Sequence, residues 1–408
     1  MPDILTPGIY IQEVPTGARP IEAVGTSTAA FIGVAPNADA YPHEARGINN
    51  WSQFAKDFSA EGAASTPLSL AVNGFFQNGG SRCYVVNIGT KKELVGDGRQ
   101  RKGIEVLEEV DEVAIVAAPG FSDAASYAVI LEHCERLGDR VAILDAPEDV
   151  RDISQLKIVA TSGPAKPKKG APAEGASAEP TAPTGGVRAP QSERGYAAYY
   201  FPWLVVRDPV SKQLANVPPS GHIAGIYART DATRGVHKAP ANEAVRGALD
   251  LTYNVTRQEQ GELNPLGVNC IRQFATQGIL VWGARTLASD PQWRYINVRR
   301  LFNRIEESIA NGTRWVVFEP NDRTLWKSIR RDITAFLMLQ WREGALMGAT
   351  PEEAFFVQCD EETNPPEVID AGMVVTVIGI APVKPAEFVI FRIGQSAAGT
   401  EIETQGGA

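Results

Sequence analysis

The sequence predicts a mixed α/β fold, and two observations support that prediction. Short runs of apolar and β-branched residues alternate with segments whose apolar residues recur at helical spacing, most clearly over residues 104–160. The chain is also long enough, at 408 residues with 44% hydrophobic and 21% charged residues, to bury a sizeable core in two or three domains. A wholly disordered or fibrous chain is therefore excluded.

Residues 1–20 are expected to form an extended arm that precedes the first compact unit. Within this arm, residues 8–14 (GIYIQEV) predict one short strand between two prolines. No adjacent segment can close a hairpin with this strand. Its backbone donors and acceptors therefore require a partner from elsewhere.

Residues 24–88 are expected to form a compact α/β unit. Trp51, Phe54 and Phe58 lie on one face of a short predicted helix, and the strands on either side are apolar throughout. In chain order, the expected elements are a strand at 28–34, helices at 51–58 and 67–78, and a strand at 83–88.

The alternation of strand and helix continues through residues 104–206. Residues 126–137 carry apolar side chains at helical spacing between two apolar strands, which is the pattern of a βαβ unit. The expected elements are strands at 113–117 and 141–144, a helix at 126–137 between them, and a further strand at 199–206.

Residues 162–192 interrupt this pattern. They contain six Pro, five Gly and seven Ala, and Val187 is their one large aliphatic residue. Such a segment cannot bury enough apolar surface to offset the entropy of ordering it, so we expect a flexible insertion at the surface. A second polar stretch, at 89–103, separates the first unit from the alternating region.

The second half adds further helices and strands. Val298, Leu301, Phe302, Ile305 and Ile309 fall at i, i+3, i+4, i+7 and i+11, the spacing of a helix packed on a core. In order, we expect helices at 219–230 and 241–249, a strand at 279–282, the helix over 298–309, a strand at 315–318, and a longer helix from about Arg323 with Asn321 or Asp322 as its N-cap.

The C-terminal region predicts a hairpin followed by a strand without a partner. Residues 354–359 and 373–380 read as two strands joined by a Pro-rich loop. Residues 386–393 then read as one more strand with several large apolar side chains. A free strand of this kind is an aggregation hazard unless it folds back onto its own domain or pairs with a neighbouring copy.

Charge and composition exclude several classes of function. The net charge of −9 is not that of a strongly basic nucleic-acid binder. Residues 1–160 carry a net −9 and residues 193–408 a net −2, so the basic side chains that could meet an acidic partner lie mostly in the second half.

The chain begins with no signal peptide pattern, and no segment has the length of a membrane span, so we expect neither secretion nor membrane insertion. We expect reduced, buried thiols at Cys83, Cys134, Cys270 and Cys359.

No catalytic motif accounts for the α/β pattern. Gly96-Asp97-Gly98 begins like a dinucleotide loop, but Arg101 stands where the third glycine belongs. The sequence has no Gly-Lys dipeptide for a P-loop and no G-x-S-x-G nucleophile elbow. A metal site at His133 and Cys134 would need distant ligands. We expect no cofactor, metal or catalysis, and an α/β enzyme or nucleotide-binding protein with an unrecognised motif stays as the alternative.

Several segments, in order along the chain, resemble the contractile tail sheath proteins of phage tails, R-type pyocins and related contractile injection systems. The segment at 217–242 (VPPSGHIAGIYARTDATRGVHKAPAN) is the most specific of them. The others are 6–14 (TPGIYIQEV), 25–33 (GTSTAAFIG), 75–85 (FFQNGGSRCYV), 283–286 (GART), 295–300 and 385–391 (PAEFVIF). Residues 90–200 match weakly, and the 162–192 insertion is not part of the resemblance.

The resemblance implies a division of the chain into five parts. These are an N-terminal arm at 1–20, a first part of the sheath core at 21–89, an outer α/β domain at 90–215 that carries the insertion, a second part of the core at 216–381 with a receiving hairpin, and a C-terminal arm at 382–408. It also implies a homo-oligomer, a helical stack of six-subunit rings around an inner tube protein, with baseplate and terminator or cap proteins as further partners and no nucleic acid.

The two unpaired strands would then be donated to neighbouring subunits. The residues expected to make this contact are Ile9, Tyr10, Ile11 and Val14 in the first arm and Phe388, Val389, Ile390, Phe391 and Ile393 in the second. The receiving hairpin would be lined by Phe355, Phe356, Val357, Val374, Val375, Val377 and Ile378. Heterologous contacts that do not close on themselves build tubes.

The inner tube would be held by a basic stripe. Lys327, Arg330 and Arg331 fall on one face of the long helix, opposite its apolar residues, and suit an acidic tube surface. A solvated helix face is the alternative. Arg299, Arg300 and Arg304 are weaker candidates for the same role. The sheath would assemble in the cytoplasm and contract irreversibly, driving the tube through a target envelope as part of a phage tail or injection particle.

Overall fold

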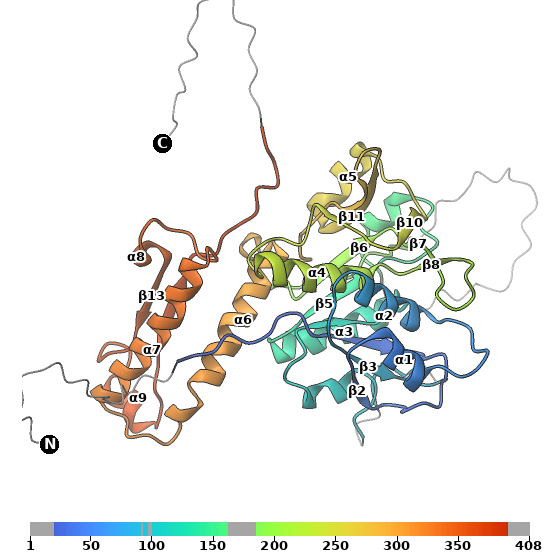
Figure 1. The fold of residues 1–408 in the computed structure, drawn as a ribbon. Helices are drawn as coiled ribbons and strands as arrows, with labels where there is room; N and C mark the ends of the chain where they lie inside the picture. Colours follow the sequence, from blue (N-terminus) through green and yellow to red (C-terminus); the bar gives the residue numbers. More distant parts are fainter. Residues whose placement is uncertain (1–19, 91–92, 97–99, 162–184, 391–408) are drawn as a thin grey trace, which may run out of the picture.

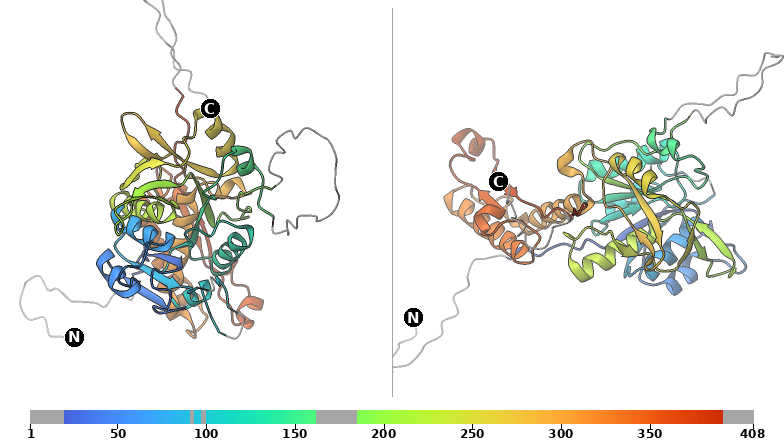
Figure 2. Two further views of the ribbon diagram at one scale, coloured as in Figure 1. Left: turned by 90° about the vertical axis from the view of Figure 1, so that its right-hand side faces the viewer. Right: turned by 90° about the horizontal axis from the view of Figure 1, so that it is seen from above.

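The computed structural model describes residues 20–90, 93–96, 100–161 and 185–390. These residues form two lobes, which Figures 1 and 2 show side by side. The larger lobe is built on a nine-stranded sheet, and the smaller contains helix α7 (Arg323–Arg342) and a two-stranded hairpin. Helix α6 (Ile296–Gly312) runs from the first lobe to the second.

The large sheet has a parallel centre and antiparallel edges, in the order β2-β3-β1-β4-β5-β6-β11-β12-β9. The six strands from β3 to β11 are parallel, whereas β2, β12 and β9 run antiparallel to their neighbours. The bounds are β1 Ala29–Gly33, β2 Ala45–Ile48, β3 Cys83–Asn87, β4 Ile115–Ala117, β5 Val141–Asp145, β6 Ala197–Phe201, β9 Glu243–Ala244, β11 Val268–Phe274 and β12 Gly278–Val281. The predicted mixed α/β class is confirmed.

Both faces of this sheet are covered, because alternate residues of each buried strand point to opposite sides. Phe31 joins the core under α1, α2 and α4, while its neighbour Ile32 joins the core under α3 and α5. The helices are α1 Trp51–Phe58, α2 Pro67–Gln77, α3 Ala124–Leu137, α4 Ser220–Arg234 and α5 Arg257–Leu263, with short 3₁₀ helices η1 Ile104–Glu109, η2 Ile153–Lys157, η3 Asn264–Leu266 and η4 Pro291–Trp293.

Helices α2 and α4 approach each other closely because glycines line their contact. A Cβ at Gly221 would lie 2.2 Å from the carbonyl oxygen of Ala71, and a Cβ at Gly225 would lie 2.4 Å from that of Phe75. The imidazole of His222 fills the space that a side chain at position 74 would need. The close approach of the two helix backbones therefore explains why residues 220–225 of the segment 217–242 are small or tightly packed.

The smaller lobe has its own core. Leu325, Ile329, Ile333 and Phe336 of α7 are buried against α6 and the hairpin. The other elements of this lobe are the 3₁₀ helix η5 Arg314–Val316, α8 Pro351–Ala354, β13 Phe355–Gln358, α9 Pro366–Asp370 and β14 Val377–Ile380. The side chain of Asp322 accepts a hydrogen bond from the amide of Leu325 at 2.8 Å, which confirms the predicted N-cap of α7.

Three predicted elements are wrong. Residues 241–249 form the edge strand β9 and strand β10 (Ala248–Leu251) rather than a helix, with Gly247 at a positive φ of 86° between them. Residues 315–318 form the 3₁₀ helix η5 and a turn in which Phe318 has φ 70°, and no described strand pairs with them. The expected strand at 199–206 is two strands in two sheets: β6 stays in the large sheet, and β7 (Leu204–Arg207) pairs with β8 (Leu214–Val217) and β10.

The insertion is shorter than its composition predicts. Residues 162–184 lie outside the described residues, but residues 185–192 return to the larger lobe. Arg188 forms a parallel bridge with Val159, and Ala189 and Ser192 are buried. The flexible-insertion prediction is therefore wrong for 185–192. All four cysteines are buried and unpaired, as expected.

Candidate functional site

Among the described residues, the hairpin of the smaller lobe is open along both sides. β13 and β14 pair antiparallel, with Phe355 opposite Ile380. Phe355 packs towards α7, whereas the ring of Phe356 lies on the opposite face and covers Gly379, where a Cβ would come within 2.1 Å of it. Within the described part of the chain, no strand pairs with the outer edge of β13 or of β14. Each edge therefore presents backbone donors and acceptors to a further strand.

The second strand of the hairpin is shorter than the sequence predicts, because Asn364 occupies the backbone before it. The buried amide of Asn364 donates to the carbonyl of Val375 at 3.0 Å and accepts from its N–H at 2.7 Å. The strand expected at 373–380 therefore begins at Val377, and Val374 and Val375 lie in an irregular segment before it. The other residues predicted to line the hairpin lie on its strands: Phe355, Phe356, Val357, Val377 and Ile378.

The C-terminal segment leaves β14 and crosses from the smaller lobe to the larger (Figure 1). Val383 donates its N–H to the carbonyl of Ala345, and its own carbonyl accepts from Asn297 of α6. The strand expected at 386–393 is not formed over 386–390, and the rest of it, with Phe391 and Ile393, lies outside the described residues. The exposed fractions are 73% for Phe388, 68% for Val389 and 82% for Ile390.

Glu387 fixes this segment to the larger lobe, a contact that the sequence analysis missed. Its carboxylate accepts from Nε and Nη2 of Arg285 at 2.8 and 2.7 Å, from Asn264 at 2.7 Å and from the Tyr295 hydroxyl at 3.0 Å. Burial alone would raise the pKa of Glu387, but these hydrogen bonds outweigh it and hold the pKa below its ordinary value. The sequence offers one sign of this contact, because Glu387 is a single acidic residue in an otherwise apolar run.

The N-terminal segment runs along α6 towards the smaller lobe. Ile21 packs against Gly312 at the C-terminal end of the helix, and the N–H of Val24 donates to the Ser308 hydroxyl at 3.0 Å. The chain therefore enters residue 20 beside the smaller lobe (Figure 1). The predicted arm strand, with Ile9, Tyr10, Ile11 and Val14, lies outside the described residues.

Two buried arginines hold the N-terminal part of α6 in the larger lobe. Arg299 is 1% exposed, and its guanidinium lies 4.2 Å from the ring centre of Trp293 and 4.7 Å from that of Tyr196. Arg300 is 3% exposed and pairs with Asp231 of α4. Neither can face a tube, so the weaker prediction is wrong for Arg299 and Arg300, whose charges dock α6 onto its own lobe. Arg304, the third candidate, is half-buried and donates to Gln340 at 3.3 Å, and its contact with a tube stays a prediction.

Asp145 of the larger lobe is a buried carboxyl that serves the fold. Burial raises the pKa of Asp145 to about 7 against the effect of its hydrogen bonds, and such a shifted carboxyl would interest an enzyme hypothesis. Both of its oxygens, however, are taken by the N–H and hydroxyl of Ser220, where they cap α4. Among the described residues, no three His, Cys, Asp or Glu side chains are placed to share a metal ion.

A polar hollow of about 260 Å³ lies beside Glu387's partner Arg285. Its lining includes Arg285, Thr286, Ser289 and Arg294, and contains no carboxylate, imidazole, thiol or amine. None of the described residues that line it carries a group that titrates near neutral pH. The described helices include none that is both long and apolar enough to span a membrane.

Comparison with known proteins agrees with this arrangement of lobes and segments. Two family models match adjacent parts of the chain: the phage tail sheath protein central domain over residues 191–287, and the phage tail sheath C-terminal domain over residues 288–396. The sheath of an extracellular contractile injection system called PVC, solved in the contracted state, is 30% identical with a TM-score of 0.72, and the match covers 97% of this chain and 99% of that one. The chain belongs to the phage tail sheath family.

Two further sheath proteins resemble the chain. The helical sheath of the anti-feeding prophage, also in the contracted state, is 29% identical with a TM-score of 0.71 and covers 97% of this chain and 100% of that one. The tail sheath protein of Vibrio phage KVP40 is 32% identical over 177 residues, which are 42% of this chain and 26% of the phage protein. The chain thus spans about a quarter of that curated phage sheath protein.

In this sheath-family chain, the predicted basic stripe lies on the exposed face of α7. Lys327, Arg330 and Arg331 are exposed, while Ile329 and Ile333 on the other face are buried. Arg331 contacts Asp332 at 3.0 Å. Lys327 and Arg330 form no ion pair with any residue that the structure describes, so both charges face solvent.

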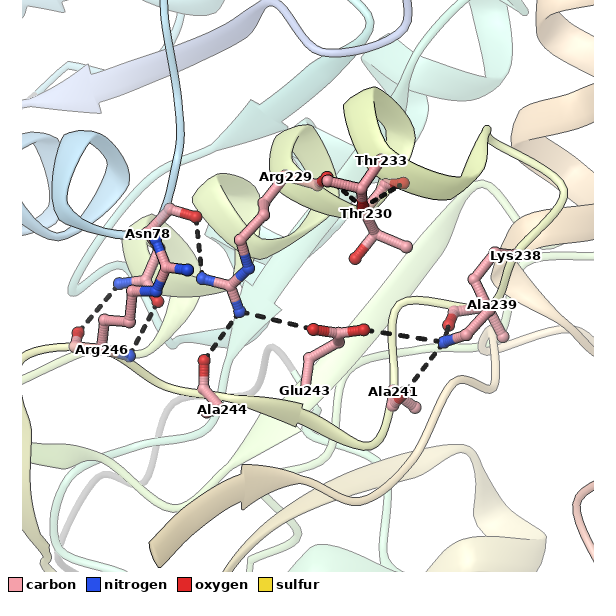
Figure 3. Close-up of polar contacts among 10 residues, drawn as sticks. All are labelled: Asn78, Arg229, Thr230, Thr233, Lys238, Ala239, Ala241, Glu243, Ala244 and Arg246. Carbon is pink, nitrogen blue, oxygen red and sulfur yellow. Dashed lines mark hydrogen bonds and ion pairs between the residues drawn. The ribbon is translucent and has the colours of Figure 1, made fainter. Parts of the chain in front are cut away.

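The most specific sheath segment, 217–242, is fastened to the edge of the large sheet by polar contacts (Figure 3). Arg229 of α4 donates to the carbonyl of Asn78 at 3.0 Å and to that of Ala244 in β9 at 2.8 Å. Glu243 lies between Arg229 and Lys238, at 3.6 and 3.9 Å. Burial lowers the pKa of both cations, and Glu243 partly opposes that effect. Arg229 thus joins three elements of its own subunit, which is a structural role.

Proposed function

We propose that this chain is the subunit of a contractile sheath that polymerises as a helical array of six-subunit rings around an inner tube. The observation that carries the proposal is the hairpin β13–β14, which has two open edges, beside a C-terminal segment that exposes Phe388, Val389 and Ile390. A two-stranded hairpin is marginal by itself and gains stability from added strands. The fold and the family support the same function.

Strand exchange between subunits would satisfy both features at once. The arm strand at 8–14 and the strand at 386–393 would add to the hairpin edges of neighbouring copies. The segments leading to the two arms lie at different ends of the smaller lobe, which suits donation to different neighbours (Figure 1). Such a network keeps subunits attached while their lobes move.

Contraction would be driven by a change in packing between subunits. An extra burial of about 200 Å² of apolar surface per subunit is worth roughly 5 kcal/mol, which is about the free energy that shifts one subunit from 1:99 to 99:1. The PVC and anti-feeding prophage sheaths were solved in the contracted state, and we infer that this chain reaches a similar state. Its role is mechanical rather than catalytic, with the tube, baseplate and terminator proteins as partners and a phage tail or injection particle as its location.

The five-part division of the chain belongs to this proposal. The proposed boundary at 89/90 falls between β3 and β4 of the large sheet, so the outer domain and the core would share the hydrogen bonds of that sheet. The proposed boundary at 215/216 falls within β8 of the three-stranded sheet. The joint between lobes is α6, which the proposal places inside the second part of the core.

Deleting the arms tests strand exchange. Chains lacking residues 1–15 or residues 388–408 should be folded and monomeric by circular dichroism and size-exclusion chromatography, yet form no sheath in negative-stain electron microscopy when co-expressed with a tube protein. Deletion of residues 166–184 is the matched control and should still yield sheaths. Normal sheaths from either arm deletion would contradict the proposal, and a small defined oligomer from the intact chain would favour the enzyme alternative.

A further inference from the structure

The C-terminal strand faces a problem of register. In a hairpin, the turn fixes which residues face each other, but a strand donated from another chain has no turn. A slip by one residue would turn every side chain to the opposite face of the receiving sheet. Phe388 and Ile390 would then face the side of the sheet that Val389 should face. The ring of Phe388 would pack against the wrong surface of the receiving hairpin. Something outside the strand has to set its position.

Glu387, the residue directly before the exposed run, is held in a site built for a carboxylate. Arg285 binds it with two parallel hydrogen bonds of 2.8 and 2.7 Å, which is the strongest and most directional geometry for this pair. Asn264 and Tyr295 add one hydrogen bond to each carboxylate oxygen. The side chains of Arg285 and Glu387 are only 11% and 18% exposed. We call these four residues the Glu387 clamp.

The clamp is itself rigid. Arg285 and Tyr295 are opposite each other in an antiparallel bridge, so the backbone sets both donors side by side. The remaining Nη1 of Arg285 donates to the carbonyl of Asn264 at 3.1 Å, which fixes the plane of the guanidinium. Contacts within the larger lobe therefore help to orient the Arg285 guanidinium towards the carboxylate.

A second attachment, at Val383, limits how far the chain before the clamp can shift. Val383 is hydrogen-bonded through both its N–H and its carbonyl, to Ala345 and to Asn297. The chain between these two fixed points is residues 384–386. An extended residue spans at most about 3.6 Å, so a link of three residues leaves little room for Glu387 to shift while both attachments hold.

We propose that the Glu387 clamp sets the register of the donated C-terminal strand, so that Phe388 always begins the strand at the same position. The proposal rests on the strand exchange proposed above. It assigns Arg285, Asn264 and Tyr295 as positioning residues: they contact the arm of their own subunit and act on the neighbour only through the strand that follows.

Insertions on the strand side of the clamp test this directly. One alanine inserted after Glu387 reverses the faces of the strand, whereas two alanines restore them. We expect the single insertion to lower sheath yield about tenfold more than the double insertion, measured by sedimentation and electron microscopy. In a Glu387→Ala background the arm can slide, so the two insertions should give equal yields. Equal yields with the clamp intact would overturn the proposal.

A second measurement reads the clamp in the unassembled subunit. Because the four native cysteines are buried, a nitroxide on Val389→Cys reports the arm alone. Its motion should increase when Arg285→Lys keeps the charge but removes the two-point geometry, and Arg294→Lys, in the same hollow, should leave it unchanged. An arm equally mobile in all three chains would contradict a clamp.

The two proposals fail in different ways. Assembly by a chain lacking residues 388–408 would remove strand exchange itself, whatever the insertions do. Loss of assembly on that deletion, together with equal yields from the single and double insertions, would leave strand exchange standing and remove the register proposal alone. If the Glu387→Ala chain does not assemble, the comparison of insertions in the intact clamp decides.

Discussion

Arg300 of α6 and Asp231 of α4 form a two-point ion pair inside the protein, with Nη1–Oδ1 and Nη2–Oδ2 distances of 3.0 and 2.5 Å. Their side chains are 2% and 6% exposed. Thr26 completes the contact, since its hydroxyl donates to Asp231 at 2.6 Å and its carbonyl accepts from Arg300 at 2.9 Å. The N-terminal segment, the large lobe and the helix that carries the small lobe thus meet at one buried charge pair.

Replacing one member of this pair should destabilise the subunit strongly. Arg300→Met leaves the Asp231 carboxylate buried without its cation, and we expect a loss of about 3–5 kcal/mol in the free energy of unfolding. Urea denaturation monitored by circular dichroism measures it. Arg234→Met, at an exposed arginine near the end of α4, is the control and should change little. The double variant Arg300→Met with Asp231→Leu should recover part of the loss, and a double variant worse than the single would contradict the account.

The glycine contact between α2 and α4 predicts opposite effects for two Gly→Ala variants. At Gly221 the new Cβ would lie 2.2 Å from a backbone oxygen, so the helices must separate and stability should fall by about 1–3 kcal/mol. At Gly261, inside α5, no atom lies within 4 Å of the new Cβ, so alanine should stabilise by about 0.5–1 kcal/mol. Thermal unfolding of both variants checks the pair. Stabilisation by Gly221→Ala would show that the helices are looser than described.

Acid should destabilise the subunit through His222. Burial lowers the pKa of His222 to about 4, against about 6.5 in an unfolded chain, so the unfolded state binds the proton first as pH falls. The contribution of neutral His222 is complete above pH 6.5 and shrinks below it, by about 2 kcal/mol at pH 5. Urea denaturation at pH 7.5 and pH 5 measures this slope. His222→Gln should reduce this slope, even though it lowers stability at both pH values. It should not abolish the slope, because burial also lowers the pKa of His133 to about 4, and an unchanged slope would assign the pH dependence to other groups.

The basic stripe on α7 predicts a selective loss of tube binding. Changing Lys327, Arg330 and Arg331 together to Glu should abolish co-assembly with the tube protein in a pull-down, because an acidic tube surface would then be repelled. Because Arg331 pairs with the buried carboxylate of Asp332, the double variant Lys327→Glu with Arg330→Glu is the control that keeps this ion pair. It should fold normally, since both side chains are exposed, and should lose tube binding in the same way. Raising the salt concentration should weaken the wild-type interaction in the same direction. Unaltered co-assembly would assign the stripe to a solvated surface.

Periodicity predicted the elements that have a strong local pattern. The helix at 51–58 has the predicted bounds because an aromatic face and the Asn50 cap specify it within eight residues. The segments at 241–249 and 315–318 were mispredicted because tertiary contacts decide them: one pairs with β12 at the sheet edge, and the other is a tight link between α6 and α7. Apolar composition alone does not separate a helix from a strand over so few residues.

The candidate site was predictable only in part. Strand patterns predicted the two strands of the hairpin and the apolar run that contains Phe388. The receiving role of the hairpin came from the family resemblance, and the strand expected at 386–393 is not formed over 386–390. The Glu387 clamp was not predictable, since Asn264, Arg285 and Tyr295 come from three separate loops and helix ends that only the fold brings together. The charges of Arg299 and Arg300 pointed to a tube surface, but their burial assigns them to the joint between lobes.

Val159 and Arg188, which flank the 162–184 segment, lie side by side on the large lobe in a parallel bridge, with hydrogen bonds of 2.7 and 3.1 Å on either side. Doubling the length of a loop with fixed ends adds only about 0.6 kcal/mol of closure entropy. Foreign sequence can therefore be inserted between these two residues at a small cost in stability. An epitope or a small folded module placed there would be displayed once per subunit, at the regular spacing of the assembled lattice.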